Sequence, residues 1–66
     1  MAAHYEIDSR VRVQGEVKYG DEWYDVDTSG TVVDLRPRTV LVTLDRIDGD
    51  ANATCIVKRK YITDVF

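Results

Sequence analysis

The amino-acid sequence predicts a small all-β domain, a single five-stranded, strongly bent and partly open barrel. Four runs of β-type residues, at residues 10–14, 31–35, 39–44 and 54–58, precede a short final strand at residues 65–66. Within the runs, apolar residues alternate with polar ones, which is the period-two pattern of strands with one buried face. We find no convincing helix of about ten residues or more in the chain. Strands this few and short can bury one face by closing partly on themselves.

The first strand is expected to end at Gly15. The segment after it is too polar for a buried strand and has no helical apolar stripe. We therefore expect residues 18–27 to form a long acidic and aromatic loop after the first strand. Trp23, Tyr24 and Val26 would fold part of this loop back onto the barrel as an irregular hairpin-like excursion.

The inward faces of the two middle strands follow from the same alternation. In residues 31–35, Val33 and Leu35 form the better inward pair, although Val32 leaves the assignment open. Residues 39–44 make the strongest strand of the chain. Its predicted core residues are Val40, Val42 and Leu44, with Leu41 and Thr43 facing outward.

The connections follow from their turn-forming residues. Residues 36–39 are predicted to form a tight turn, because Pro37 presets φ and cannot donate to a ladder. Residues 48–52 form a loop on composition. A strand then runs from residue 54 to residue 60, and a short turn with 3₁₀ character at residues 61–64 leads into the final strand.

The length of 66 residues predicts one domain, with a flexible N-terminus at residues 1–8 and the barrel at residues 9–66. A domain of about 60 residues buries only about 60% of the surface that its unfolded chain exposes. A deep substrate pocket would remove core from a chain with little to spare. We therefore expect a binding domain and no enzyme.

The single cysteine, Cys55, indicates a cytoplasmic protein, because small secreted domains usually rely on several disulfides. No signal-peptide pattern and no apolar run of membrane-spanning length are present, so we expect no membrane association. Cys55 lies in a predicted strand and is expected to be a small buried hydrophobe.

The charges are unevenly placed. The net charge is −3, with four acids and no base in residues 20–27, and with three bases and no acid in residues 56–60. We therefore expect two electrostatic faces, each of which suits a different partner. An acidic chain begins at a disadvantage as a non-specific nucleic-acid binder.

Several stretches resemble the SH3-like small barrels. Residues 9–13 are similar to the opening strand of that superfamily, residues 30–34 to the Gly-x-Val entry of the second strand, and residues 40–45 to the third strand with its final Asp. Residues 61–66 resemble the short turn and last strand. The resemblance covers residues 8–66 and extends to KOW-type domains of transcription and ribosomal proteins. It extends about equally to small electron-transfer-associated barrels such as the peripheral stromal subunit of photosystem I.

The acidic aromatic loop is the main candidate for a protein-binding surface, together with the turn that contains Pro37. Aromatic faces attract cations, and neighbouring carboxylates add Coulomb attraction and hydrogen bonds for arginine. The candidate residues are Tyr19, Asp21, Glu22, Trp23, Tyr24, Asp25, Arg36 and Arg38. The expected partner is another protein, or a basic or proline-containing peptide such as SH3 domains bind. The chain would then be an accessory or adaptor module.

The alternative is a KOW-like nucleic-acid or ribonucleoprotein contact through a basic patch. Its candidate residues are Arg36, Arg38, Lys58 and Lys60, with Arg10 and Arg12 as neighbours and Tyr61 available for stacking. On a continuous strand, Lys58 and Lys60 would share one face. The simpler interpretation is that these charges are solvated and protect an edge strand.

No residue pattern indicates catalysis, a metal or a cofactor. His4 is the only histidine, and Ser9 and Ser29 have no histidine base in view. Asp48 and Asp50 flank a glycine without the remainder of a calcium loop, so they are expected to be turn formers. The sequence therefore predicts no catalytic residue, no metal site and no cofactor.

Overall fold

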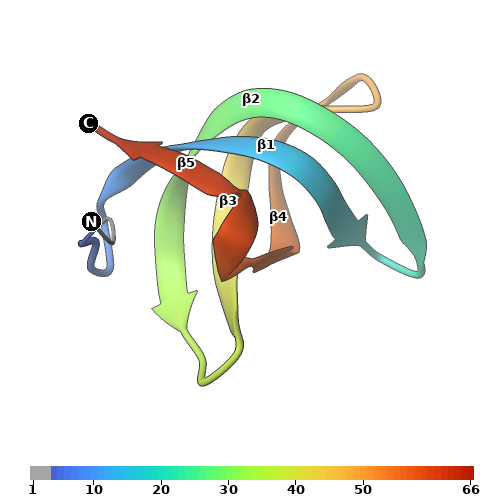
Figure 1. Ribbon diagram of the computed structural model, residues 1–66. Helices are drawn as coiled ribbons and strands as arrows, with labels where there is room; N and C mark the ends of the chain where they lie inside the picture. Colours follow the sequence, from blue (N-terminus) through green and yellow to red (C-terminus); the bar gives the residue numbers. More distant parts are fainter. Residues whose placement is uncertain (1–3) are drawn as a thin grey trace.

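The computed structural model describes residues 4–66 and shows five strands with one short 3₁₀ turn (Figure 1). The elements are β1 (Arg10–Tyr19), β2 (Glu22–Leu35), β3 (Thr39–Ile47), β4 (Asp50–Lys58), η1 (Arg59–Tyr61) and β5 (Ile62–Val65). The predicted all-β class is confirmed. No helix within the described residues is long and apolar enough to cross a membrane.

All strand pairs are antiparallel, in the order β2-β3-β4-β1-β5 with a further pairing between β2 and β1. β1 pairs with β2 along its whole length. One end of β1, at Val17 and Lys18, also meets β4, and the other end, from Val11 to Val13, meets β5. The ladder therefore runs from β1 through β2, β3 and β4 and returns to β1. Figure 1 shows the β1–β2 hairpin arching over β3 and β4.

β2 changes its partner part-way along its length. Residues 22–31 pair with β1, and residues 30–35 pair with β3 on the other edge. At the crossing point, a Cβ atom on Gly30 would lie 2.6 Å from the carbonyl oxygen of Thr43. Such a contact is too close for any side chain, so only glycine lets β3 approach β2 here.

The core is a continuous cluster of small and medium apolar side chains from all five strands. Its members are Val11, Val13, Val17, Val32, Val40, Val42, Leu44, Ile47, Ala53, Cys55, Val57 and Ile62. Most of them are β-branched, and such side chains pack well on a pleated surface. The predicted burial of Val40, Val42, Leu44 and Cys55 is confirmed.

The prediction that Val33 and Leu35 face inward is wrong. Val32 is fully buried, whereas Val33 is 40% exposed and Leu35 is 39% exposed. The register between β2 and β3 shifts between Val32 and Asp34, which leaves Val33 as an extra residue in a β-bulge. A bulge interrupts the strict alternation of faces, so the pattern of residues 31–35 could not be extended across it.

The predicted long loop at residues 18–27 is also wrong. These residues belong to β1 and β2, and only Gly20 and Asp21 form the turn between the strands. Gly20 has a φ of +63°, which suits a type II′ hairpin turn with glycine in its first central position. The segment is polar because one face of the hairpin meets solvent, while Tyr24 and Val26 on the other face pack against the core.

The remaining boundaries differ by a few residues. The turn at residues 36–39, which contains Pro37, forms as expected, with the Arg36 N–H donating to the Thr39 carbonyl at 3.0 Å. The predicted loop at residues 48–52 is shorter, because β3 extends to Ile47 and β4 begins at Asp50. The 3₁₀ turn begins at Arg59, two residues before its predicted start.

Part of the predicted flexible N-terminus, residues 1–3, lies outside the described residues. In the rest, the Asp8 N–H donates to the Val32 carbonyl at 2.7 Å, and the Glu6 N–H donates to Ser9 Oγ at 2.9 Å. The first bond extends the pairing with β2 by a short distance, and the second is a local contact within the N-terminal segment. The flexibility of this segment stays a prediction.

The buried position of Val42 predicts that Val42→Asp abolishes folding. An unpaired carboxylate in this core would cost about 3–5 kcal/mol, which is comparable to the whole stability of a domain this small. Thermal unfolding followed by circular dichroism is expected to show no cooperative transition. The matched control is Thr54→Asp at an exposed position of β4, which should melt cooperatively. A near-native melt of Val42→Asp would contradict the assigned core.

Candidate functional site

The β1–β2 hairpin divides the predicted acidic aromatic site between two faces. Residues directly opposite each other in the register share a face, and successive residues alternate. Trp23 lies opposite Lys18, and Asp25 lies opposite Glu16, all on the outer face. Tyr24 lies opposite Val17 on the inner face. The hairpin therefore does not bring Trp23 together with the neighbouring tyrosine.

On the inner face, two tyrosines and three acids form a compact group that we call the tyrosine cluster. The Tyr24 hydroxyl donates to Glu22 at 2.7 Å, and the Tyr19 hydroxyl donates to Asp50 at 3.0 Å. The two ring centroids are 6.3 Å apart. Asp48, in the turn between β3 and β4, also contributes to the raised pKa of Tyr24 through its negative charge. The cluster links the end of the hairpin to that turn.

The hydrogen bonds change the acidity of both phenols. The bond to Glu22, followed by partial burial, raises the pKa of Tyr24 to about 12. The bond to Asp50 raises the pKa of Tyr19 as well. Each hydroxyl proton is thus committed to a carboxylate of the same chain, so we assign the tyrosine cluster mainly to holding the hairpin in place.

Sequence reasoning missed Asp48 and Asp50 as members of this cluster, because it treated them only as turn formers. The residues stand more than twenty positions after Tyr24, and only the tertiary fold brings the turn between β3 and β4 to the hairpin. No local sequence signal reveals such a contact.

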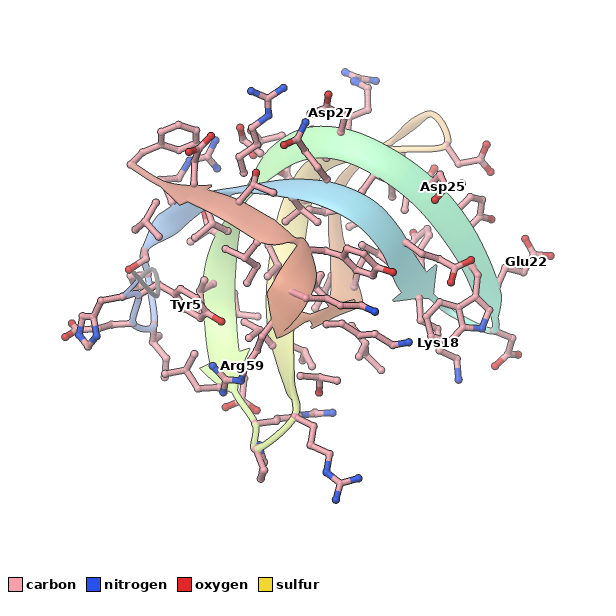
Figure 2. The ribbon with its side chains drawn as sticks, in the orientation of Figure 1. Tyr5, Lys18, Glu22, Asp25, Asp27 and Arg59 are labelled. Atoms are coloured by element: carbon pink, nitrogen blue, oxygen red, sulfur yellow. The ribbon has the colours of Figure 1, made fainter. Side chains whose placement is uncertain are left out.

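On the outer face, Trp23 lies among cations. The side chain is 50% exposed, and the Lys58 ammonium lies 5.8 Å from the centre of its ring. Lys18 is its direct neighbour across the hairpin. Figure 2 shows Asp25 and Asp27 along the arch of β2, and Lys18 beneath the end of β1. Trp23 is therefore placed where the acidic and basic regions of the surface meet.

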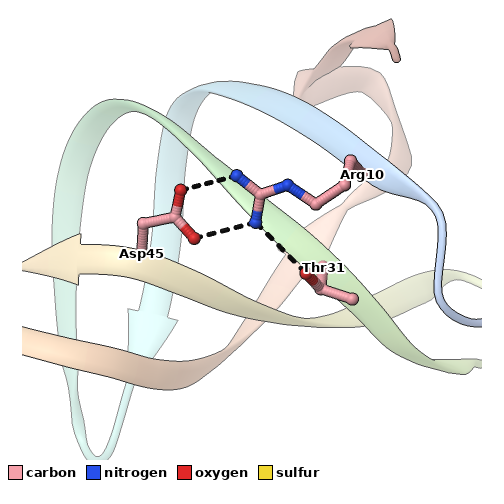
Figure 3. A network of polar contacts seen from close by, with 3 residues as sticks. All are labelled: Arg10, Thr31 and Asp45. Atoms are coloured by element: carbon pink, nitrogen blue, oxygen red, sulfur yellow. Dashed lines mark hydrogen bonds and ion pairs between the residues drawn. The ribbon is translucent and has the colours of Figure 1, made fainter.

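Two bidentate ion pairs lie further along the outer face, toward the start of β1. Arg12 donates to both oxygens of Asp27 at 3.0 and 3.1 Å. Arg10 donates to both oxygens of Asp45 at 2.8 and 2.6 Å and to the Thr31 hydroxyl at 3.2 Å (Figure 3). The hydrogen bonds from the Arg10 guanidinium, together with its positive charge, lower the pKa of Asp45. Arg10 and Arg12 are thus used within the fold and do not extend the basic patch.

Glu16 and Asp25 form a pair of like charges on the same face. They stand directly opposite each other in the β1–β2 register, and both are exposed. Within residues 4–66, neither carboxylate forms an ion pair. Like charges placed directly across a ladder destabilise it. This part of the hairpin therefore carries two negative charges that no ion pair among residues 4–66 compensates.

A second group of side chains, which we call the basic surface, surrounds the end of β4. Its members are Lys18, Arg36, Arg38, Lys58, Arg59 and Lys60. Lys18 lies opposite Ile56 of β4 in the register. Lys58 lies opposite Thr39, next to the turn that contains Arg36 and Arg38. Arg59 donates to the Arg36 carbonyl, which joins η1 to that turn.

The structure corrects two expectations about these bases, namely that Lys58 and Lys60 share one face of a strand and that the Tyr61 ring is open for stacking. β4 ends at Lys58 and Lys60 belongs to η1, so the two lysines do not alternate along one strand. The Lys60 ammonium instead lies 5.1 Å from the centre of the Tyr61 ring. That ring also lies against Gly15, where a Cβ atom would overlap it, so one side of it is covered.

The turn with Arg36 and Arg38 also does not adjoin the acidic residues of the hairpin. The turn follows the C-terminal end of β2, whereas Trp23 is near its N-terminal end, and the strand has 14 residues (Figure 1). Arg36 also contacts Asp34 of its own strand at 3.5 Å. The predicted protein-binding set thus falls into three places: the tyrosine cluster, the outer face of the hairpin and the basic surface.

The geometry offers binding surfaces and little reactive chemistry. Cys55 is buried, and burial raises the pKa of its thiol, so the nucleophilic thiolate is disfavoured. In the part of the chain that the structure describes, no three His, Cys, Asp or Glu side chains gather as a metal site. Comparisons with protein-family models, curated proteins and solved structures found no match for this chain. The function is therefore inferred from the geometry of the surfaces.

The bond between Tyr24 and Glu22 predicts a specific dependence on pH. Folding raises the pKa of Tyr24 from 10.0 to about 12, so the protonated phenol stabilises the folded state. This contribution is complete below pH 10.0 and is lost as the pH rises through about 12. Glu22→Gln is expected to lower the pKa of Tyr24, measured from the Cζ chemical shift in an NMR titration.

Asp25→Asn is the matched control for this titration, because Asp25 lies on the opposite face of the same strand. It removes the same charge and should leave the Tyr24 titration almost unchanged. An unaltered pKa of Tyr24 in Glu22→Gln would contradict the inner-face contact.

Proposed function

We propose that this chain is a non-catalytic SH3-like barrel that serves as an accessory or adaptor module by binding another protein through the β1–β2 hairpin. The observation that carries the proposal is the position of Trp23. The only tryptophan of the chain is half exposed, while smaller side chains fill the core. The return of the strand pairing to β1 and the 3₁₀ turn before β5 support the barrel. The lone, unpaired cysteine supports a cytoplasmic location.

The exposure of the Trp23 ring is better explained by binding to a partner than by stabilisation of the fold. Tryptophan is enriched among the residues that dominate binding energy at protein interfaces. A domain with a small core gains stability by burying large rings, so the exposure of Trp23 forgoes a stabilising contribution. Its position near the turn of the hairpin, on the strand with the unpaired edge, also makes it accessible to a partner's surface.

The acidic pair beside Trp23, and not the two lysines that flank the ring, favours a basic partner. Lys58 already holds its ammonium over the ring, which shows that this aromatic face accepts a cation. Beside the ring, Glu16 and Asp25 form the uncompensated acidic pair. An arginine or lysine of a partner can therefore contact the ring and a carboxylate together.

Trp23→Ala is expected to weaken binding to the physiological protein partner by at least about tenfold, since truncation of a residue that dominates an interface costs about 2 kcal/mol or more. The domain should still melt cooperatively, because the side chain is half exposed. Binding is measured by pull-down from source-cell extract, followed by titration of the partner so identified. The matched control is Leu35→Ala, at a comparably exposed apolar residue on the far end of β2. If the folded Trp23→Ala variant retains every partner, the proposal is wrong.

A second candidate function is binding of single-stranded nucleic acid through the basic surface. The observation that favours it is the lack of carboxylate partners. Among residues 4–66, no ion pair involves Lys18, Lys58 or Lys60, and Trp23 stands beside two of these lysines. Cations that follow the backbone and a ring on which a base stacks are the features of such sites.

Salt dependence tests this second candidate. Binding of labelled single-stranded RNA or DNA should weaken between about 50 mM and about 200 mM salt, with a logarithmic slope near −0.7 for each phosphate neutralised. Quenching of the single tryptophan reports stacking directly. Lys58→Glu should abolish binding, whereas the same charge change at Arg46, outside the basic surface, should weaken it only slightly. Absence of binding at low salt would exclude this function.

A further inference from the structure

The N-terminal half of β2 has one unpaired edge. Residues 22–29 pair with β1 on one side, and pairing with β3 on the other side begins only at Gly30. Within the described residues, no strand or loop makes a backbone hydrogen bond to that second side. Figure 1 shows this part of β2 as the outer strand of the arching hairpin.

The register identifies which backbone groups point to the unpaired edge. Antiparallel ladders alternate between residues that bond to the partner strand and residues that bond away from it. Val32 exchanges bonds with Asp8 and Ser9 on the β1 side, and the register is unbroken from Thr31 to Glu22. The backbone N–H and C=O groups of the even-numbered residues from 22 to 32 therefore point toward β1. The N–H and C=O groups of Trp23, Asp25, Asp27 and Ser29 face the unpaired edge.

The charge of this edge selects against a second copy of the chain. Residues 22–29 contain three acids and no base. Two such edges brought together would place carboxylates near one another, and acidic edges of this kind resist self-pairing. The same edge attracts an extended segment that carries lysine or arginine.

We propose that the unpaired edge of β2 binds an extended basic segment of another protein by β-strand addition. The segment exchanges backbone hydrogen bonds with Trp23, Asp25 and Asp27 and becomes an additional strand of the sheet. This inference rests on the proposed function, in which the hairpin is the protein-binding surface, and it specifies how the partner is held.

Asp25 is the position where the fit is most specific. On one side, β1 places the like charge of Glu16 opposite it. On the other side is the unpaired edge, where a lysine or arginine of the added strand would stand opposite it on the same face. The added strand thus supplies the cation that the fold omits. Asp27 differs, because Arg12 already satisfies it.

The experiment uses the full chain and a capped eight-residue peptide of alternating lysine and valine. Two further peptides have the same sequence with every other backbone nitrogen methylated, one at the odd positions and one at the even positions. Each keeps its charge and loses the hydrogen-bond donors on one edge. Binding is followed in ¹H–¹⁵N NMR spectra together with amide hydrogen exchange. We expect the amides of Asp25 and Asp27 to exchange at least about tenfold more slowly with the unmodified peptide.

The matched variants are Asp25→Pro, which removes the edge-facing donor, and Asp25→Asn, which keeps that donor and removes the charge. Neither change removes a hydrogen bond to β1, because the backbone of Asp25 points away from it. Asp25→Pro should lower affinity at least about tenfold, and Asp25→Asn by less. One of the two methylated peptides should lose affinity to the same extent, which tests the inference even if Asp25→Pro does not fold.

Equal binding of the unmodified peptide and both methylated peptides would overturn β-strand addition, as would a complete lack of peptide binding. These results leave the proposed function to a separate test. If Trp23→Ala abolishes partner binding while backbone methylation has no effect, the hairpin binds through its face and only the strand-addition inference fails. If Trp23→Ala has no effect on the partner, the proposed function itself fails.

Discussion

The passage of β2 from one neighbour to another at Gly30 is the constraint on which the arrangement of this molecule depends. The strand pairs with β1 before that point and with β3 from it onward. Close contact with the Thr43 carbonyl excludes any side chain there. Because a single strand serves two ladders, the sheet can bend around its valine-rich core. The same division leaves residues 22–29 with one paired edge and one unpaired edge. The core and the candidate binding edge therefore have a common geometric origin.

The hairpin is held by polar contacts on its inner face, which leaves its outer face available. Tyr19 and Tyr24 commit their hydroxyl groups to acids near the β3–β4 turn and at the hairpin end. On the outer face, ion pairs neutralise Asp27 and Asp45, whereas Asp25 has only Glu16 opposite it. Exposed ion pairs contribute little stability, typically about 0–1 kcal/mol each. Their main consequence here is to concentrate the uncompensated negative charge beside Trp23.

The sequence predicts those features that depend on alternation within one strand. Val40, Val42 and Leu44 point into the core as their period-two pattern indicates, and the turn at Pro37 forms where proline favours it. The two largest failures involve pairing between strands. The bulge at Val33 shifts the faces of β2, and the unbroken register of the hairpin converts a predicted loop into two strands. A local pattern contains no information on register, and a shift of one residue reverses every face that follows. For the same reason, Trp23 could be named as a binding candidate but not placed among lysines, and Asp50 could not be linked to Tyr19.

An exposed strand edge normally invites association of identical chains, so its persistence in a small domain requires a physical explanation. The acids of residues 22–29 supply one, because two copies of the same acidic edge repel each other. Repulsion of this kind also confers specificity, because it weakens binding of a second copy of the chain and does not weaken binding of a basic segment. Backbone groups alone would accept any extended chain. In the proposed strand addition, the carboxylates limit acceptance to a chain with complementary charge, and Trp23 adds an aromatic contact at one end of the edge. In the proposed complex, selection of a partner therefore depends on exposed side chains that the core of the fold does not require.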